Sequence, residues 1–379
     1  MTVPEREKCV LIVAGETSGD FHGAHLVGAM RQRDPHIYFC GIGGERLKAQ
    51  GVELLMEAHE ISVVGITEVI SKLPRVFAGI SAIKKIFKRR RPDLVILIDF
   101  PDFNLHIAKL AKKQGLSVLY YISPQLWAWR AGRIEKIRRY VDQMAVILPF
   151  EQDFYQKHNV AATFVGHPLL DYYTEHDTAF EIDGQKARAI GILPGSRRSE
   201  IEKNLPVMLA AATRIREAFP DIRFLISIAP GIDRQWMSQI IDPYRKNVGI
   251  EQVGGSVRRV FENSSLVLAA SGTVTLETAI FGVPMIIIYR ISAISYSLGR
   301  ALVNVNHIGL VNIIADERVV PELIQEAASP AAIAREAGDI LSRPERMQKI
   351  RQKLKTVRHR LGTPGAAERT ADIALNMLD

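Results

Sequence analysis

The chain has 379 residues, of which 47% are hydrophobic and 24% charged, and its formal net charge is +8. This length exceeds what one hydrophobic core usually supports, so we expect two domains. The composition excludes a largely disordered chain. Two cysteines exclude a disulfide framework and fit a reducing cytoplasm. The excess of positive charge favours an anionic partner: a phosphate-bearing substrate, a nucleic acid or an anionic lipid surface.

The N-terminal segment MTVPEREKCV mixes acids and bases, so it lacks the charged and then apolar layout of a signal peptide. No uninterrupted apolar run approaches the ~20 residues that span a bilayer. We therefore expect a protein that is soluble or that lies on a membrane without crossing it.

Apolar runs typical of buried strands alternate with helical patterns. Up to a turn-rich, charged stretch at 166–186 that is typical of a linker, the runs are Cys9–Ala14, Ile37–Gly41, Leu94–Asp99, Ser117–Tyr121 and Gln143–Leu148. After it they are Ala189–Leu193, Phe224–Ile228, Leu266–Ala270 and Met285–Tyr289. This alternation predicts right-handed βαβ units and parallel sheets. We expect an α/β protein of two Rossmann-like domains that face a cleft.

The domain boundaries follow from the same pattern. The first domain is expected at 1–168 and the second at 169–354. Past Pro321 the sequence is helical and no further strand is expected. The terminal helices, from about 355 to 379, are expected to pack back on the first domain.

Acidic residues stand at the end of the apolar run LVILIDFPDFN, residues 94–104. Ligands of open α/β sheets bind beyond the carboxyl ends of the strands, so Asp99 would be held at the mouth of a crevice. Asp99 is thus our first candidate for a catalytic base. The alternative is that Asp99 and Asp102 only form a turn or cap a helix from about Asn104 to Gln114.

A second candidate site is GETSGD, residues 15–20, where the first strand ends and a helix follows from about Phe21 to Arg31. Its glycines let a ligand approach the backbone, and a helix start offers free N–H groups to oxyanions. The dinucleotide fingerprint G-x-G-x-x-G is absent. The alternative is an ordinary tight turn.

The second half of the chain has two polar loops after strands. One contains Arg197, whose guanidinium can grip phosphate oxygens in two places, and the other contains Ser271, Gly272 and Thr273 before a helix that carries Glu277. These groups could bind a nucleotide diphosphate. The sequence has no paired Cys and no D-x-D, so we expect neither a metal nor another cofactor. The alternative for Arg197 is a solvated loop with an incidental arginine pair.

Six motifs stand in order along nearly the whole chain: GETSGD at 15–20, DFPDFN at 99–104, SPQLWAWR at 123–130, GHP at 166–168, LPGSRRSEI at 193–201 and SGTVTLE at 271–277. The set closely resembles the lipid-A-disaccharide synthase family. The resemblance implies a glycosyltransferase B fold and an inverting transfer. It implies UDP-2,3-diacylglucosamine as donor, 2,3-diacylglucosamine 1-phosphate (lipid X) as acceptor, and a β-1,6-linked disaccharide 1-phosphate and UDP as products, in lipid A biosynthesis.

The resemblance also assigns roles to residues. It places the base on Asp99. It places Glu16, Ser18, Gly19 and Asp102 near the acceptor or reacting sugar, and Arg197, Ser271, Gly272, Thr273, Glu277 and Asn312 in the UDP site. The expected location is the cytoplasmic face of the inner membrane, as a peripheral protein that binds no nucleic acid, and a homodimer is left open.

Three further motif residues have two interpretations each. Trp127 and Trp129 could wall the acceptor site, but such aromatics are more often core. His167 could mark a hinge or touch phosphate, and a capped turn is slightly favoured.

Residues Leu73 to Pro92 combine an apolar stripe at helical spacing with many cations, an arrangement suited to an anionic lipid interface. The expected membrane contacts are Phe77, Ile80, Lys84, Lys85 and Arg89. The alternative is a helix whose apolar stripe packs on the first sheet and whose basic face is solvated.

Two other functions compete. The run Arg89 to Arg91 and the positive charge would suit an RNA-binding protein, but the aromatic platforms of RNA recognition modules are lacking. A nucleotide-sugar epimerase, or another glycosyltransferase of the same fold, is a closer alternative because fold does not fix function.

Overall fold

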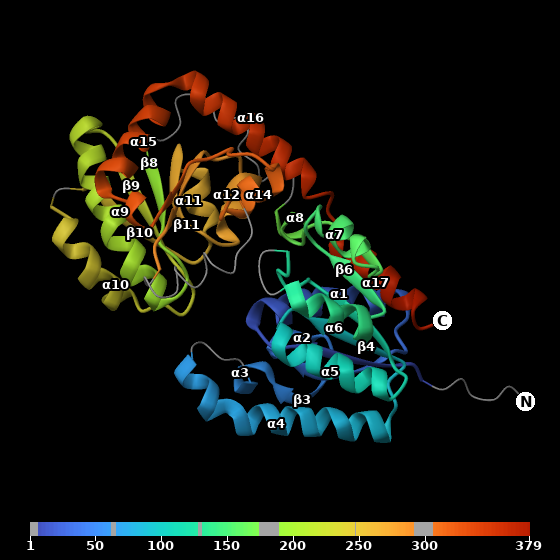
Figure 1. Ribbon diagram of the computed structural model, residues 1–379. Coiled ribbons are helices and arrows are strands. Elements are labelled where there is room, and N and C mark those ends of the chain that lie inside the picture. Colours follow the sequence, from blue (N-terminus) through green and yellow to red (C-terminus); the bar gives the residue numbers. More distant parts are fainter. Residues whose placement is uncertain (1–6, 62–65, 128–130, 174–188, 247, 292–305) are drawn as a thin grey trace, which may run out of the picture. The chain divides into compact units, whose positions relative to one another are not determined.

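The computed structural model describes residues 7–61, 66–127, 131–173, 189–246, 248–291 and 306–379 (Figure 1). The chain divides into two compact units. The first comprises Met1–Asp171 and Leu361–Asp379, and the second comprises Tyr172–Arg360. Most of the linker expected at 166–186 lies outside the described residues.

The first unit is built on a parallel sheet of seven strands in the order β3-β2-β1-β4-β5-β6-β7. The strands are β1 (Cys9–Ala14), β2 (Tyr38–Gly43), β3 (Glu53–Glu57), β4 (Leu94–Ile98), β5 (Ser117–Tyr121), β6 (Gln143–Val146) and β7 (Ala162–Phe164). The strand order reverses between β1 and β4. In open α/β sheets this switch point, at the carboxyl ends of the strands, is where ligands bind.

Helices cover both faces of this sheet. They are α1 (Thr17–Arg33), α2 (Glu45–Ala49), α3 (Ala58–Ile61), α4 (Ile66–Arg89), α5 (Pro101–Lys113), α6 (Ile134–Tyr140), α7 (Glu151–Lys157), α8 (Leu169–Tyr172, whose last residue falls in the second unit) and α17 (Ala366–Asn376), with a 3-10 turn η1 at Ala131–Arg133. Successive strand residues point to opposite faces. Leu11 and Val13 of β1 therefore join a core under α4, α5 and α6, whereas Val10 and Ile12 join another under α1 and α17.

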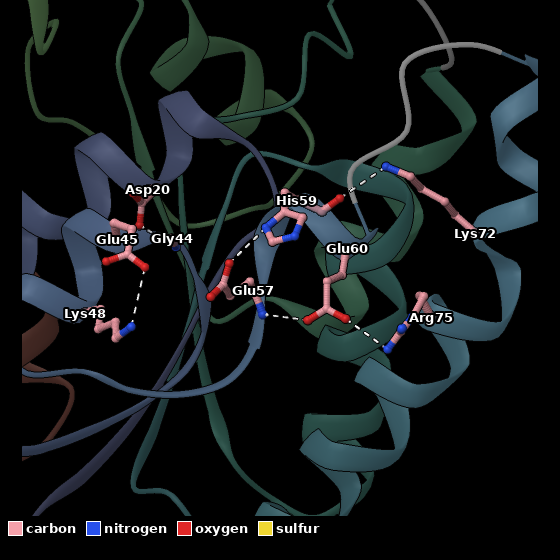
Figure 2. Close-up of polar contacts among 9 residues, drawn as sticks. All are labelled: Asp20, Gly44, Glu45, Lys48, Glu57, His59, Glu60, Lys72 and Arg75. Carbon is pink, nitrogen blue, oxygen red and sulfur yellow. Dashed lines mark hydrogen bonds and ion pairs between the residues drawn. The ribbon is translucent and has the colours of Figure 1, made fainter.

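The junction after β1 is fixed by the buried carboxylate of Asp20. It accepts a hydrogen bond from the backbone N–H group of Gly44 at 2.6 Å (Figure 2). It also accepts from the N–H groups of Arg46 and Leu47, both at 3.1 Å, and all three are donors left unpaired by the start of α2. Helix α1 begins at Thr17, four residues before the expected start. GETSGD is thus a strand-to-helix junction whose last four residues are helical.

The second unit is a parallel sheet of six strands in the order β10-β9-β8-β11-β12-β13. The strands are β8 (Ala189–Leu193), β9 (Arg223–Ile228), β10 (Ile250–Gly254), β11 (Leu266–Ala270), β12 (Met285–Tyr289) and β13 (Glu322–Ile324). The helices are α9 (Arg198–Ala218), α10 (Arg234–Ile241), α11 (Arg258–Glu262), α12 (Val274–Ile280), α14 (Leu310–Ala315), α15 (Pro330–Ser342) and α16 (Pro344–Arg360), with 3-10 turns η3 (Asp242–Tyr244) and η4 (Gln325–Ala327). Its order reverses between β8 and β11.

Two further expectations about elements were wrong. A strand, β13, does follow Pro321; it has three residues and pairs with β12 alone, so it is too short for a strand pattern to show. Helix α5 begins at Pro101 and not near Asn104, because proline is well suited to the first turn of a helix. Helix α17 packs against α1 of the first unit.

Candidate active site

The backbone turns sharply where β4 ends. Asp99 and Phe100 have φ values of 46° and 51°, in the left-handed region that non-glycine residues rarely adopt. The turn is held from two sides, because the Tyr120 hydroxyl donates to the Asp99 carbonyl oxygen at 2.6 Å and Asn104 Nδ2 donates to the same oxygen at 2.7 Å. Strain of this kind persists where the surroundings over-determine it, often at functional sites.

This turn packs directly on the junction after β1. A Cβ atom at Gly15 would lie 2.2 Å from the Phe100 ring, so only glycine allows this approach. Since β1 and β4 are neighbours in the sheet, GETSGD and DFPDFN meet at the switch point of the first unit. Two motifs separated by 84 residues in sequence thus form one site.

The Asp99 carboxyl is electrostatically unusual. Its burial, and then the nearby negative charge of Glu16, raise its pKa to about 6. A carboxyl with a pKa near the working pH is both ionised at neutral pH and basic enough to take a proton. The arrangement can serve as a general base.

The other predicted site residues of the first unit differ in their exposure to solvent. The side chains of Glu16 and Ser18 are exposed, whereas Gly19 is buried against Ala14 and contributes close packing. Asp102 is exposed in the first turn of α5 and forms an ion pair with Arg133.

The predicted nucleotide site maps to the switch point of the second unit. Strands β8 and β11 are paired neighbours, so the loops that follow them lie side by side at the carboxyl edge. The Arg197 side chain is exposed and makes a long contact of 3.5 Å with Glu200, which leaves the guanidinium available. Gly272 and Thr273 are exposed in the loop after β11, and Ser271 is half-buried there.

Glu277 on α12 accepts a hydrogen bond from the Tyr173 hydroxyl at 3.0 Å, and burial raises the pKa of its carboxyl. This tyrosine was not expected at the site, since it stands 104 residues away in sequence and no motif contains it.

The resemblance places Asn312 in the UDP site, and this stays a prediction; in the structure its side chain is hydrogen-bonded within the second unit. Asn312 is fully buried; its Oδ1 accepts from Val319 N and Val320 N, and its Nδ2 donates to Val320 O and Glu322 Oε1. All four hydrogen-bonding positions are therefore used in folding the segment between α14 and β13.

Of the three motif residues with two interpretations each, the structure describes Trp127 and His167. Trp127 is half-buried, and its indole N–H donates to the buried carboxyl of Glu151 at 3.1 Å. His167 is 5% exposed and its Nδ1 accepts the Leu169 N–H at 3.2 Å, which is a capped turn. Trp129 lies outside the described residues.

Helix α4 divides its apolar stripe between the sheet and the solvent. Ile83 and Phe87 are buried in the core and Ile80 packs partly buried against it, whereas Phe77 is 66% and Leu73 41% exposed. A cavity of about 320 Å³ lies between α4 and α5. It is lined by Lys84 and Lys85 and by Ser81, Phe87, Lys88, Leu110, Lys113 and Gln114. Arg89 is exposed at the end of the helix.

Polar contacts fasten the start of α4 to the carboxyl edge of the sheet. Glu60 of α3 pairs with Arg75 at 3.0 Å, and Lys72 donates to the His59 carbonyl oxygen at 3.1 Å (Figure 2). No helix among the described residues is long and apolar enough to cross a bilayer. The same residues contain no group of three or more His, Cys, Asp or Glu arranged to hold a metal ion.

Solved structures similar to this chain share the fold. UDP-GlcNAc 2-epimerase from Neisseria meningitidis, bound to UDP-GlcNAc, aligns with a TM-score of 0.65 at 12% identity over 97% of this chain and 100% of that chain. CalG4, the calicheamicin glycosyltransferase, aligns with a TM-score of 0.63 at 14% identity over 99% of each chain. The two parallel-sheet domains are those of the glycosyltransferase B class, as the sequence predicted.

Sequence comparison narrows the class to a family. The model of the lipid-A-disaccharide synthetase family matches residues 10–377. Curated lipid-A-disaccharide synthases from Syntrophus aciditrophicus and Geobacter metallireducens are 48% and 45% identical to this chain, over 98% of it in both cases and over 98% and 97% of their own lengths. The chain belongs to the lipid-A-disaccharide synthase family, whose members are glycosyltransferases of lipid A biosynthesis.

Proposed function

We propose that the protein transfers the diacylglucosamine of UDP-2,3-diacylglucosamine to the 6-hydroxyl of 2,3-diacylglucosamine 1-phosphate, with inversion, to give the β-1,6-linked disaccharide 1-phosphate and UDP. Family membership over nearly the whole chain supports the reaction. The observation that carries the mechanism is the Asp99 carboxyl, with its pKa near 6, at the switch point of the first sheet.

Asp99 acts as the general base. A sugar hydroxyl is a weak nucleophile at neutral pH, so its proton must leave as it attacks the anomeric carbon. The ionised carboxylate of Asp99 accepts that proton while the bond from the anomeric carbon to the UDP oxygen breaks. The exposed Glu16 and Ser18, next to Asp99 on the first junction, contact the sugars.

The second unit binds UDP. The departing diphosphate gains negative charge in the transition state, so donors aimed at its oxygens lower the barrier. The Arg197 guanidinium and the backbone N–H groups of Ser271 to Thr273 supply these donors at the switch point between β8 and β11. Glu277 accepts a hydrogen bond from a ribose hydroxyl.

The exposed face of α4 meets the membrane that holds the acylated substrates. Leu73 and Phe77 enter the lipid interface, and Lys84, Lys85 and Arg89 face anionic headgroups. Ile80 packs against the sheet and contributes less than Phe77. The protein is then peripheral on the cytoplasmic face of the inner membrane.

An epimerase is the second candidate, since an enzyme of that activity shares the fold. The two are separated by incubating the protein with UDP-2,3-diacylglucosamine, with and without lipid X. The proposal expects UDP release and a disaccharide product only when lipid X is present. A changed sugar configuration in the nucleotide without acceptor would favour the epimerase, and UDP release that ignores the acceptor would reject the proposed reaction.

A further inference from the structure

Glu151, the first residue of α7, is a buried carboxyl outside both switch points. It is 1% exposed. Its Oε1 accepts the indole N–H of Trp127 at 3.1 Å, and its Oε2 accepts the backbone N–H groups of Leu148 at 3.0 Å and Ile147 at 3.3 Å. A buried carboxyl with this many donors has a defined orientation.

The Glu151 carboxyl is close to its ionisation point at neutral pH. Burial raises its pKa to about 7, and the hydrogen bonds from Leu148, Trp127, Ile147 and Ser123 oppose that rise. Tyr155, one turn further along α7, is a titratable group that interacts electrostatically with it. The carboxylate form binds the indole N–H more strongly than the neutral form, because charge-assisted hydrogen bonds are stronger.

The partner of Glu151 belongs to the segment that follows β5, next to Asp99. The Asp99 N–H donates to the Tyr121 carbonyl oxygen at 3.1 Å, so the segment from Ile122 to Trp127 starts at β5, the strand paired with β4, and β4 leads into the base. A second tie runs from Ser123 Oγ to the Tyr155 hydroxyl at 2.6 Å. Helix α7 therefore holds this segment at two points.

The indole is held in one orientation but is not fully covered. Trp127 lies edge-on to Phe150, with the ring centroids 4.9 Å apart, and stays half-buried. An aromatic ring that is fixed at one edge and partly accessible can form a rigid wall for a sugar ring.

We propose that Glu151 is a positioning residue for the acceptor: through its hydrogen bond to Trp127 it fixes the Ser123–Trp127 segment as a wall of the acceptor site beside Asp99. The proposal rests on the proposed function, because it assigns the acceptor to this edge of the first unit. It assigns no proton transfer to Glu151.

The test compares Glu151→Gln, Trp127→Phe and the double variant. Trp127→Phe keeps an aromatic ring but removes the N–H donor. We expect each single variant to lower kcat/KM for the acceptor about tenfold, since a displaced positioning group costs rate steeply, while KM for the UDP-sugar stays within twofold. The double variant should be no worse than the worse single variant, because both break one hydrogen bond. Glu135→Gln, an exposed carboxyl on α6, is the matched control.

A readout without substrate separates this proposal from the proposed function. The fluorescence contributed by Trp127, taken as the difference between the wild type and Trp127→Phe, should titrate near pH 7 and lose that step in Glu151→Gln. If the fluorescence titration is seen but no disaccharide forms, the proposed function fails, and the acceptor role inferred for Glu151 fails with it. Acceptor kcat/KM within threefold of the wild type in folded variants, or an equal rise in KM for donor and acceptor, would overturn the inference alone.

Discussion

At the scale of single residues, the proposed reaction depends above all on Asp99. Replacing it with Asn keeps the shape of the turn but removes the proton acceptor, so we expect kcat to fall by ~10² to 10⁴. The measurement is steady-state disaccharide formation by folded protein, with Asp153→Asn, an exposed carboxyl on α7, as control. Turnover close to that of the wild type would remove Asp99 from the role of base.

The pKa of Asp99 also predicts an acid limb in the pH profile of kcat/KM. Because the carboxyl must be ionised to accept a proton, kcat/KM should decline as the pH falls through about 6. The charge on Glu16 contributes to the raised pKa, so Glu16→Gln should move this limb to lower pH. The pH profiles of the two proteins are compared; a limb that does not move would mean that another group produces it.

Arg197 is expected to act on the leaving group. We expect Arg197→Ala to lower kcat/KM on the order of 10², the loss typical of one donor to a developing charge. Its contact with Glu200 is exposed and long, so the fold should lose little. The neighbouring Arg198, which lies over the Trp236 ring, provides the control Arg198→Ala. A loss below threefold for Arg197→Ala would argue against a diphosphate contact.

The sequence predicts isolated chemical groups better than the contacts that hold them. Asp99 could be singled out as a candidate because ligands of open α/β sheets bind beyond the carboxyl ends of the strands. The hydrogen bonds from Tyr120 and Asn104 to its backbone leave no pattern in the sequence. Asn312 is a similar case, since the sequence does not show the four hydrogen bonds that its side chain makes within the second unit.

At the scale of elements, the central strands were predictable and the edge strands were not. Strands β3, β7, β10 and β13 have no counterpart among the predicted runs, and each lies at an edge of its sheet. A central parallel strand is buried on both faces and therefore reads as a continuous apolar run. An edge strand such as β10, with the sequence IEQVG, has a partner on one side and keeps polar residues.

Helix α4 has a side that packs on the sheet, as one interpretation of the sequence expects, and an exposed side for which membrane contact stays a prediction. Its inner residues pack on the sheet, while Phe77 and the cations remain outside. Each cation near an anionic surface contributes about 1 kcal/mol. We expect the triple change Lys84→Glu, Lys85→Glu and Arg89→Glu to release the protein from anionic vesicles at moderate salt in a co-sedimentation assay.

A matched control reverses three exposed cations of the second unit, Lys203, Arg214 and Arg223. This control has the same net charge as the α4 variant, so a difference between them reports the location of the charge. Equal co-sedimentation of the wild type and the α4 variant would leave α4 as a helix that only covers the sheet.

At the scale of the whole molecule, the chain returns to its first unit after completing the second. Hydrogen bonds join the returning segment, Leu361–Asp379, to the residues that follow β7. The His167 N–H donates to the Leu361 carbonyl oxygen at 2.9 Å, the Asp171 carboxylate accepts the Gly365 N–H at 2.5 Å, and Arg369 Nε donates to the Val165 carbonyl oxygen at 2.8 Å. The GHP motif is therefore a docking point for the C-terminal helix, which explains a conspicuous motif without a ligand.

This docking point should make the first unit sensitive to acid. Burial, and then the neighbouring His22, lower the pKa of His167 to about 3, against 6.5 for an exposed histidine. Between these values the unfolded chain binds a proton that the folded protein excludes, so stability is lost as the pH falls below about 6.5. At pH 5 the loss is about 2 kcal/mol for this group.

The variant His167→Asn removes the titrating group, while its amide oxygen can still accept the Leu169 N–H. Its Tm should therefore drop less between pH 7.5 and pH 5 than that of the wild type. The control His36→Asn, at an exposed histidine, should match the wild type. Identical drops in all three proteins would show that the charge on His167 does not limit the stability of the C-terminal return.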